Sequence, residues 1–324
     1  MVYGRRRFLI YLLNSILCIS TVCACNSGAD NPYPSMDKTV TESDSPSASE
    51  NKRDNTPKVL VPSADGTTVY ETEEVHIDAS NLSEGYFMAK YTGSADKIRI
   101  LLDTPLDNTY NYLLSTAGDY EVYPLSDGNG TYRIHVYEHV VDNKYAELFS
   151  QEITVSLTDD KKGFLYPNQY VNFNSNSAAV QKGKDIVANA TTDLEAVDAV
   201  FTYVTQNVTY DYEKAATVQS GYLPSVDDTL STGKGICFDY ASLMAAMLRS
   251  QRIPTRLEIG YAGDLYHAWI SVYIEETGWI ENYIVFDGTE WVLMDPTLVS
   301  TAKASTVKEK MEQADSYYDM MYNY

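Results

Sequence analysis

The chain has 324 residues, of which 44% are hydrophobic and 21% charged, a composition typical of a globular protein long enough for two ordinary domains. Its formal net charge is −21, and this becomes −24 if the three positive charges of residues 5–7 are removed with a leader. So acidic a surface disfavours nucleic acid as a partner, because phosphates would be repelled. An acidic surface also keeps a secreted domain from associating, so the charge alone indicates no substrate.

The first 25 residues have the outline of an export signal. Three arginines at 5–7 precede an apolar run over 8–19, which is shorter than the ~20 residues that a membrane span needs. The sequence Val22-Cys23-Ala24-Cys25 resembles the lipobox of bacterial lipoproteins. The resemblance implies a signal peptide over 1–24, a lipid on Cys25, and a location outside the cytoplasm, anchored to the bacterial cell membrane. An ordinary signal peptide without lipid is the alternative.

Residues 25–57 are rich in Ser, Asp, Asn and Pro and nearly devoid of apolar side chains, which predicts a disordered tether. From 58 to 158 apolar residues instead recur with period two, which indicates strands. Examples are Val75 and Ile77, then Ile98, Ile100 and Leu102, then Tyr132, Ile134 and Val136. About seven strands separated by turn signals favour an immunoglobulin-like β-sandwich domain.

A second domain is expected over 165–324, because the apolar period changes there to three and four. Helices are predicted near 178–187, from an Asp193 cap to Val208, and after Gly235 up to Ile253-Pro254. Strands follow at 255–261, 267–275, 282–286 and 291–295, with a hairpin turn at Asp287-Gly288. This order predicts an α+β domain. The tail Tyr317–Tyr324 either forms a last strand or frays.

Cys237 is the only cysteine of the folded region once Cys18, Cys23 and Cys25 are assigned to the leader and the lipid. A structural role as a small buried side chain is one interpretation. However, its expected position in the first turn of a helix favours a reactive thiol, because the helix dipole and unpaired amides stabilise a thiolate. The same amides could hold an oxyanion, and Gly235 would let a substrate backbone approach closely.

A thiolate nucleophile needs an imidazole to move its proton and a third group to orient that imidazole. Of the four histidines, His76, His135 and His139 fall in the strand-rich half, where cross-strand surface positions are expected. His267 is therefore the candidate, and strand alternation places it on one face with Trp269 and Ser271. Asp295, before Pro296 at a strand end, is the candidate third group, although an aspartate in a turn is also common there.

These residues resemble the transglutaminase-like superfamily, whose core is papain-like. The resemblance covers roughly 165–300 and rests on four blocks in order: Gly235–Leu243, Ile253–Arg256, His267-Ala268-Trp269 and Met294–Thr297. It implies Cys237 as nucleophile, His267 as general base and acid, and Asp295 as the orienting carboxylate. It also implies an oxyanion donor in the segment 208–212, with Tyr210 favoured and Tyr212 as the alternative.

The chemistry implied by the resemblance is acyl transfer through a thioester to a protein or peptide amide. Water as acceptor gives a cysteine peptidase or amidase, which we favour because bacterial members of the superfamily are often viewed as proteases. A lysine amine as acceptor gives protein cross-linking, and a surface binding or adhesion protein with a vestigial triad is an alternative of another class. No cofactor or metal is expected, because the doublets Asp159-Asp160 and Asp227-Asp228 are more typical of solvated turns than of ligands.

Overall fold

The computed structural model describes residues 53–262, 265–281, 284–286, 291–293 and 318–324, all within one compact unit that spans Ser45–Tyr324. The predicted signal peptide, Cys25, the turn at Asp287-Gly288 and Asp295 lie outside these residues. Among the described residues, no helix has both the length and the apolarity to cross a membrane.

The end of the predicted tether is bound to the second half of the chain. The Arg53 side chain pairs with Asp193 at 2.6 Å and donates to the backbone oxygen of Gln251 at 2.7 Å. Asn55 donates to the backbone oxygen of Ala190 at 2.9 Å. The last residues of the segment 25–57 are therefore ordered, and its first part, 25–52, is outside the described residues.

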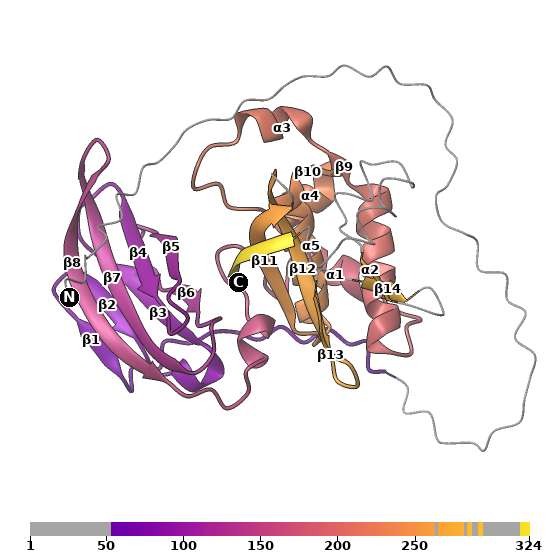
Figure 1. Ribbon diagram of the computed structural model, residues 1–324, viewed down its shortest axis with the longest axis horizontal. Coiled ribbons are helices and arrows are strands. Elements are labelled where there is room, and N and C mark those ends of the chain that lie inside the picture. Colours follow the sequence, from indigo (N-terminus) through magenta and orange to yellow (C-terminus); the bar gives the residue numbers. More distant parts are fainter. Residues whose placement is uncertain (1–52, 263–264, 282–283, 287–290, 294–317) are drawn as a thin grey trace, which may run out of the picture. The chain divides into compact units, whose positions relative to one another are not determined.

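The first half consists of strands, as predicted, and contains eight of them in two four-stranded antiparallel sheets (Figure 1). The strand orders are β1-β2-β3-β6 and β5-β4-β7-β8. Period-two residues such as Ile98, Ile100 and Leu102 are at most 1% exposed, so apolar alternation defines the buried face of each sheet. The bounds are β1 Val69–Glu71, β2 Val75–Asp78, β3 Tyr86–Tyr91, β4 Ile98–Asp103, β5 Thr109–Leu114, β6 Glu121–Pro124, β7 Gly130–Val141 and β8 Lys144–Val155, with a short 3-10 helix at Leu82–Glu84.

The three histidines of this half lie on the inner strands β2 and β7 and contact residues of neighbouring segments, which confirms the predicted cross-strand positions. His76 contacts Glu71 on the paired strand at 3.1 Å, and His135 contacts Glu147 at 3.0 Å. His139 contacts Asp96 at 3.1 Å. Because each of the three has a carboxylate partner at a strand surface, we assign them no role in a catalytic site.

The second half begins with helices and continues with strands, as expected for an α+β domain. Its helices are α1 Ala178–Ile186, α2 Asp193–Asn207, α3 Tyr212–Thr217, α4 Val226–Thr232 and α5 Cys237–Ser250, preceded by a 3-10 helix at Lys162–Leu165. Its strands are β9 Thr209–Tyr210, β10 Lys234–Gly235, β11 Thr255–Ala262, β12 Leu265–Ile274, β13 Gly278–Ile280, β14 Ile284–Phe286, β15 Trp291–Leu293 and β16 Tyr318–Asn323. The main sheet has the order β13-β12-β11-β16.

Helix starts differ in detail from the prediction. The cap of α2 is Thr192, whose hydroxyl accepts from the Glu195 amide at 3.1 Å, and Asp193 is the first helical residue. Asp193 therefore lies one residue inside the helix, and its carboxylate pairs with Arg53. The doublet Asp227-Asp228 likewise lies in the first turn of α4, where negative charge suits the helix dipole, and not in a solvated turn.

Helix α5 is the centre of the second half. Every residue from Asp239 to Ser250 is buried, because α5 packs against β11 and β12 and also against α1, α2 and α4 (Figure 1). The predicted apolar stripe, which includes Leu243 and Met247, is correct but incomplete. A helix covered from several directions is apolar around most of its surface. One of its buried polar residues, Arg249, donates to the backbone oxygens of Thr255, Tyr166 and Tyr324 at 3.0, 2.7 and 2.5 Å.

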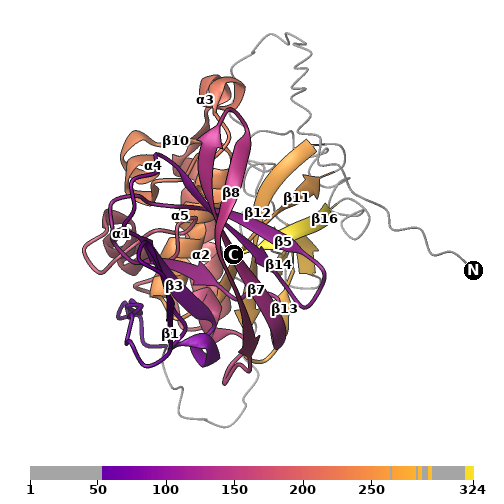
Figure 2. The same cartoon turned by 90° about the vertical axis from the view of Figure 1, so that its left-hand side faces the viewer.

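The C-terminal tail forms a strand, which decides between the two alternatives left by the sequence. β16 pairs with β11, as Figure 2 shows from the side, and a register shift occurs between Ile259 and Gly260. A Cβ on Gly260 would lie 2.0 Å from the backbone oxygen of Asp319, so this approach requires glycine. The Tyr324 ring also lies 5.4 Å from that of Tyr110 in β5, so the tail contacts both halves of the chain.

Candidate active site

Cys237 is the first residue of α5, half-buried and not in a disulfide. The residues just before it are held in place by the parallel pair β9–β10, in which Gly235 lies opposite Tyr210. The Asp211 amide donates to the Gly235 backbone oxygen at 2.9 Å. As predicted, the thiol therefore stands at a helix start, where amides lack intrahelical acceptors.

The role expected for Gly235 is wrong in one respect. A Cβ at this position would lie 2.6 Å from Cβ of Asp239, so the space beside the glycine is filled by that side chain and is not open to a substrate. The Asp239 carboxylate folds back and accepts from the Ile236 amide at 2.8 Å. Ile236 has no side-chain acceptor of its own, so Asp239 supplies the polar contact at this helix start.

His267 lies in β12, is 9% exposed, and pairs with Gly260 of β11. Its ring centroid is 6.2 Å from that of Trp269, and the register places His267, Trp269 and Ser271 on one face, as predicted. β12 packs along α5. The imidazole is thus shielded from bulk water and belongs to a strand that contacts the Cys237 helix.

Tyr266 connects the two segments. Burial raises its pKa to about 12, and interactions with Tyr322, Tyr261 and Cys237 raise it further. The beginning of β12 therefore lies within electrostatic reach of Cys237. The structure brings Cys237 and the His267 segment together, whereas Asp295, two residues beyond β15, is outside the described residues.

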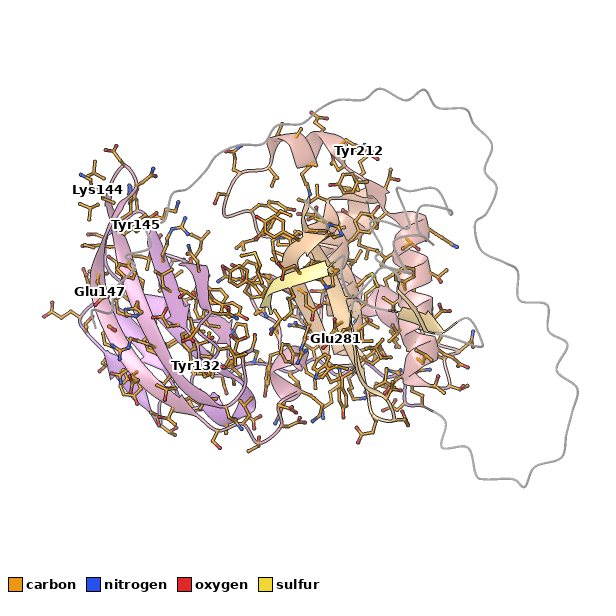
Figure 3. All side chains as sticks on the ribbon, in the orientation of Figure 1. Tyr132, Lys144, Tyr145, Glu147, Tyr212 and Glu281 are labelled. Atoms are coloured by element: carbon orange, nitrogen blue, oxygen red, sulfur yellow. The ribbon has the colours of Figure 1, made fainter. Side chains whose placement is uncertain are left out.

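The two candidate oxyanion donors differ in exposure. Tyr210 is partly buried in β9, opposite Gly235, and its ring lies 4.9 Å from that of Tyr212. Tyr212, the first residue of α3, is 70% exposed (Figure 3). The pairing with Gly235 keeps Tyr210 beside the segment that leads to Cys237. Tyr210 therefore stays the favoured candidate, and its role stays a prediction.

Sequence reasoning missed a buried carboxyl group near His267. Glu258 of β11 is 3% exposed and lies opposite Trp269, two pairs along the strands from Gly260 and His267. It accepts from Ser271 Oγ at 2.7 Å, and burial raises its pKa to about 7. The residues on the same face of the strand as Glu258 are Arg256 and Gly260, and neither is aliphatic. The sequence therefore contained no sign that this face is buried.

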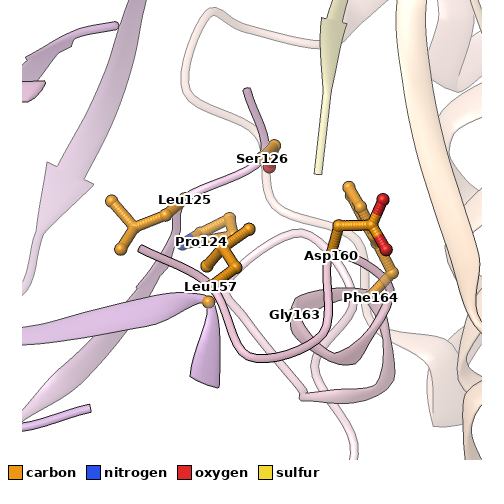
Figure 4. Close-up of a pocket in the computed structure, with 8 residues that line it drawn as sticks. Pro124, Leu125, Ser126, Leu157, Asp160, Gly163 and Phe164 are labelled. Atoms are coloured by element: carbon orange, nitrogen blue, oxygen red, sulfur yellow. The ribbon is translucent and has the colours of Figure 1, made fainter. Parts of the chain in front are cut away.

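A small pocket elsewhere in the chain contains none of the predicted site residues (Figure 4). It is lined by Gly85, Pro124, Leu125, Ser126, Leu157, Asp160, Gly163 and Phe164. Its lining comes from the end of β6, from loops of the first half and from the 3-10 helix Lys162–Leu165, so it is separate from the Cys237 site.

Comparison with curated and solved proteins gives partial likenesses. UPF0252 protein MJ1282 of Methanocaldococcus jannaschii is 25% identical over 173 residues, which are 50% of this chain and 43% of that protein, so the chain spans less than half of its length. A candidate cysteine protease from Cytophaga hutchinsonii is 18% identical, with a TM-score of 0.34 over 72% of this chain and 70% of that one. LapG of Legionella pneumophila is 15% identical, with a TM-score of 0.31 over 44% of this chain and 72% of LapG.

A family model matches part of the second half. The model of the transglutaminase-like superfamily matches residues 180–296, a range that extends from α1 to the residue after Asp295. The matched range contains the cysteine at the start of α5 and the histidine of β12. Residues 180–296 therefore form a core domain of the transglutaminase-like superfamily, and they include Cys237, His267 and Asp295.

Proposed function

We propose that this protein is a cysteine peptidase or amidase that cleaves amides of proteins or peptides through a thioester on Cys237. The observation that carries the proposal is the free, half-buried thiol at the first residue of α5, beside the strand that bears the buried His267. The match to the transglutaminase-like model supports it.

In the first step the Cys237 thiolate attacks the amide carbonyl carbon, and a carbon–sulfur bond forms. The carbonyl oxygen becomes negative and is held by amides at the start of α5, with the Tyr210 hydroxyl as a further donor. The carbon–nitrogen bond then breaks, and the amine leaves with a proton from His267. Asp295 orients the imidazole in this scheme.

In the second step water attacks the thioester carbonyl, and His267 takes its proton. The carbon–sulfur bond breaks, a carboxylic acid leaves and the thiolate is restored. A lysine amine in place of water would leave an isopeptide cross-link instead. The burial of His267 supports a shielded proton transfer in either case, and we favour water because bacterial members of the superfamily are often viewed as proteases.

We further propose that the enzyme is anchored outside the cytoplasm by lipid on Cys25, with the strand-rich half as an immunoglobulin-like sandwich. The Tyr132 hydroxyl, at the start of β7, donates to the Gly128 backbone oxygen at 2.9 Å (Figure 3). A tyrosine bonded back across the corner before this strand is typical of immunoglobulin-like folds. Together with the strand orders β1-β2-β3-β6 and β5-β4-β7-β8, this contact supports the proposal.

Iodoacetamide labelling of Cys237 between pH 4 and 9 tests the nucleophile. We expect labelling to persist below neutral pH in the wild type, and the midpoint to move upward, toward the ordinary cysteine value of about 8.5, in His267→Ala. His135→Ala, which removes an imidazole from the first half, is the matched control. Labelling only above pH 8, or identical curves for wild type and His267→Ala, would sink the proposal in favour of a binding protein.

The acceptor is tested with a peptide panel in the presence and absence of a primary amine. Release of free carboxylic acid that does not depend on the amine supports hydrolysis. Products that contain the amine at the expense of the acid identify the cross-linking alternative instead. Mass analysis of the native N-terminus tests the anchor, and a free N-terminus without lipid would contradict it.

A further inference from the structure

Three polar side chains meet directly behind the first turn of α5. The Asp239 carboxylate, which is completely buried, accepts from the Tyr222 hydroxyl at 2.5 Å and from Lys214 Nζ at 3.0 Å. Lys214 Nζ also donates to the Tyr222 hydroxyl at 3.0 Å. The third acceptor contact of Asp239 is the Ile236 amide, as described above. The carboxylate is therefore fully engaged in a closed network.

The network joins segments that are far apart in the sequence. Lys214 belongs to α3, Tyr222 to the connection before α4, and Asp239 to α5. Asp211, the cap of α3, accepts from the Lys214 amide at 2.8 Å. The segment that carries Tyr210 is thus tied to the segment that carries Cys237 twice, by the β9–β10 backbone pair and by the Lys214–Asp239 ion pair.

The Lys214–Asp239 ion pair also affects the charge next to Cys237. Asp239 is two residues from Cys237, and a carboxylate so close disfavours a thiolate unless a cation offsets it. Burial would lower the pKa of Lys214, but its hydrogen bonds to Tyr222 and Asp239 outweigh burial and raise it. Lys214 therefore stays positive and balances the charge of Asp239. Tyr266 of β12 also interacts electrostatically with Cys237, and His267 is the next residue of that strand.

We propose that Lys214 and Asp239, with Tyr222, are positioning residues of the site: they fix the start of α5 against the Tyr210 segment and keep the charge next to the thiol neutral. The inference rests on the proposed function, because it assigns these residues to support of Cys237 as a nucleophile. None of the three forms or breaks a bond with the substrate.

The test is the pH dependence of Cys237 labelling by iodoacetamide in Lys214→Met, Asp239→Asn and the double variant. One unbalanced charge near the thiol moves the labelling midpoint by on the order of one pH unit. We expect an upward shift in Lys214→Met, a downward shift in Asp239→Asn, and a midpoint near that of the wild type in the double variant. Loss of packing alone cannot shift the single variants in opposite directions and cancel in the double.

Two matched controls sharpen the test. Lys214→Arg keeps the charge and should keep the wild-type midpoint, and Lys234→Met removes a lysine that is exposed in β10 and should shift it less. If Lys214→Met does not fold, Lys214→Gln gives the same upward shift. Unchanged midpoints, or shifts of the two single variants in the same direction, overturn the inference.

The labelling experiment does not depend on whether the protein has catalytic activity. If Cys237 labels only above pH 8 and ignores His267→Ala, the proposed enzymatic function fails. The opposite shifts of Lys214→Met and Asp239→Asn would still report whether the ion pair balances charge at the thiol, so the two failures are distinguishable.

Discussion

Replacing Glu258 with Gln should change how the stability of the protein depends on pH. Glu258 is 3% exposed, and burial raises the pKa of its carboxyl group from 4.5 to about 7. At 1.36 kcal/mol for each pH unit, the interval between these values corresponds to on the order of 3 kcal/mol of unfolding free energy. Ser271 Oγ can still donate to the amide oxygen of Gln, so the variant keeps a polar partner there.

The direction in which the unfolding free energy changes with pH follows from proton binding. Between pH 4.5 and about 7 the folded protein keeps a proton on Glu258 that the unfolded chain has lost. The stabilisation from this proton is complete below pH 4.5 and is lost as the pH rises through 7. Gln does not titrate, so the unfolding free energy of the wild type minus that of the variant should fall by on the order of 3 kcal/mol from pH 4 to 8.

Urea denaturation followed by circular dichroism at half-unit pH steps measures this difference. Glu152→Gln is the control, because Glu152 is about half exposed in an ion pair with Arg133 and should show a far smaller change. A difference between wild type and Glu258→Gln that stays constant with pH would refute the reasoning. So would a difference that grows in favour of the wild type as the pH rises.

Two further substitutions test hydrogen bonds that stabilise the two halves of the chain. Arg249→Met leaves three buried backbone oxygens without their donor and should lower the unfolding free energy by roughly 3–5 kcal/mol, measured against the exposed control Arg133→Met; a loss below 1 kcal/mol would contradict the bonding. Tyr132→Phe removes the hydroxyl contact to Gly128 and should cost about 1 kcal/mol in the same assay, and an unchanged midpoint would show that the contact contributes nothing.

The sequence predicted those features that depend on local periodicity. Alternation along β4 and β7 predicted a buried face, and the apolar residues after Gly235 predicted α5 and the place of Cys237 at its start. The capping signal at Thr192 was readable too, because Glu195 follows three residues later. The prediction of Asp193 as the cap was wrong by one residue, because Thr192 makes the capping bond. The Asp193 carboxylate instead binds Arg53, which is 140 residues away in the sequence.

Features that depend on distant partners were not predictable from one sequence. The two-residue strands β9 and β10 are too short for any period, although they place Tyr210 opposite Gly235. Lys214 and Asp239 are 25 residues apart and read separately as ordinary surface charges. The short helix α4 did carry a signal, since Ser225 is followed three residues later by Asp228 and closed by Gly233.

The tail and the first half together support the sheet that bears His267. β16 pairs with β11, and β11 pairs through Gly260 with His267. The same tail is held by the first half, because the Tyr324 ring lies 5.4 Å from that of Tyr110 and 5.8 Å from that of Tyr112. Tyr324 is only 5% exposed, so a fragment without the first half would expose its ring to water. The predicted catalytic residues lie in the second half alone, but the strand pairing that holds His267 depends on contacts that both halves provide.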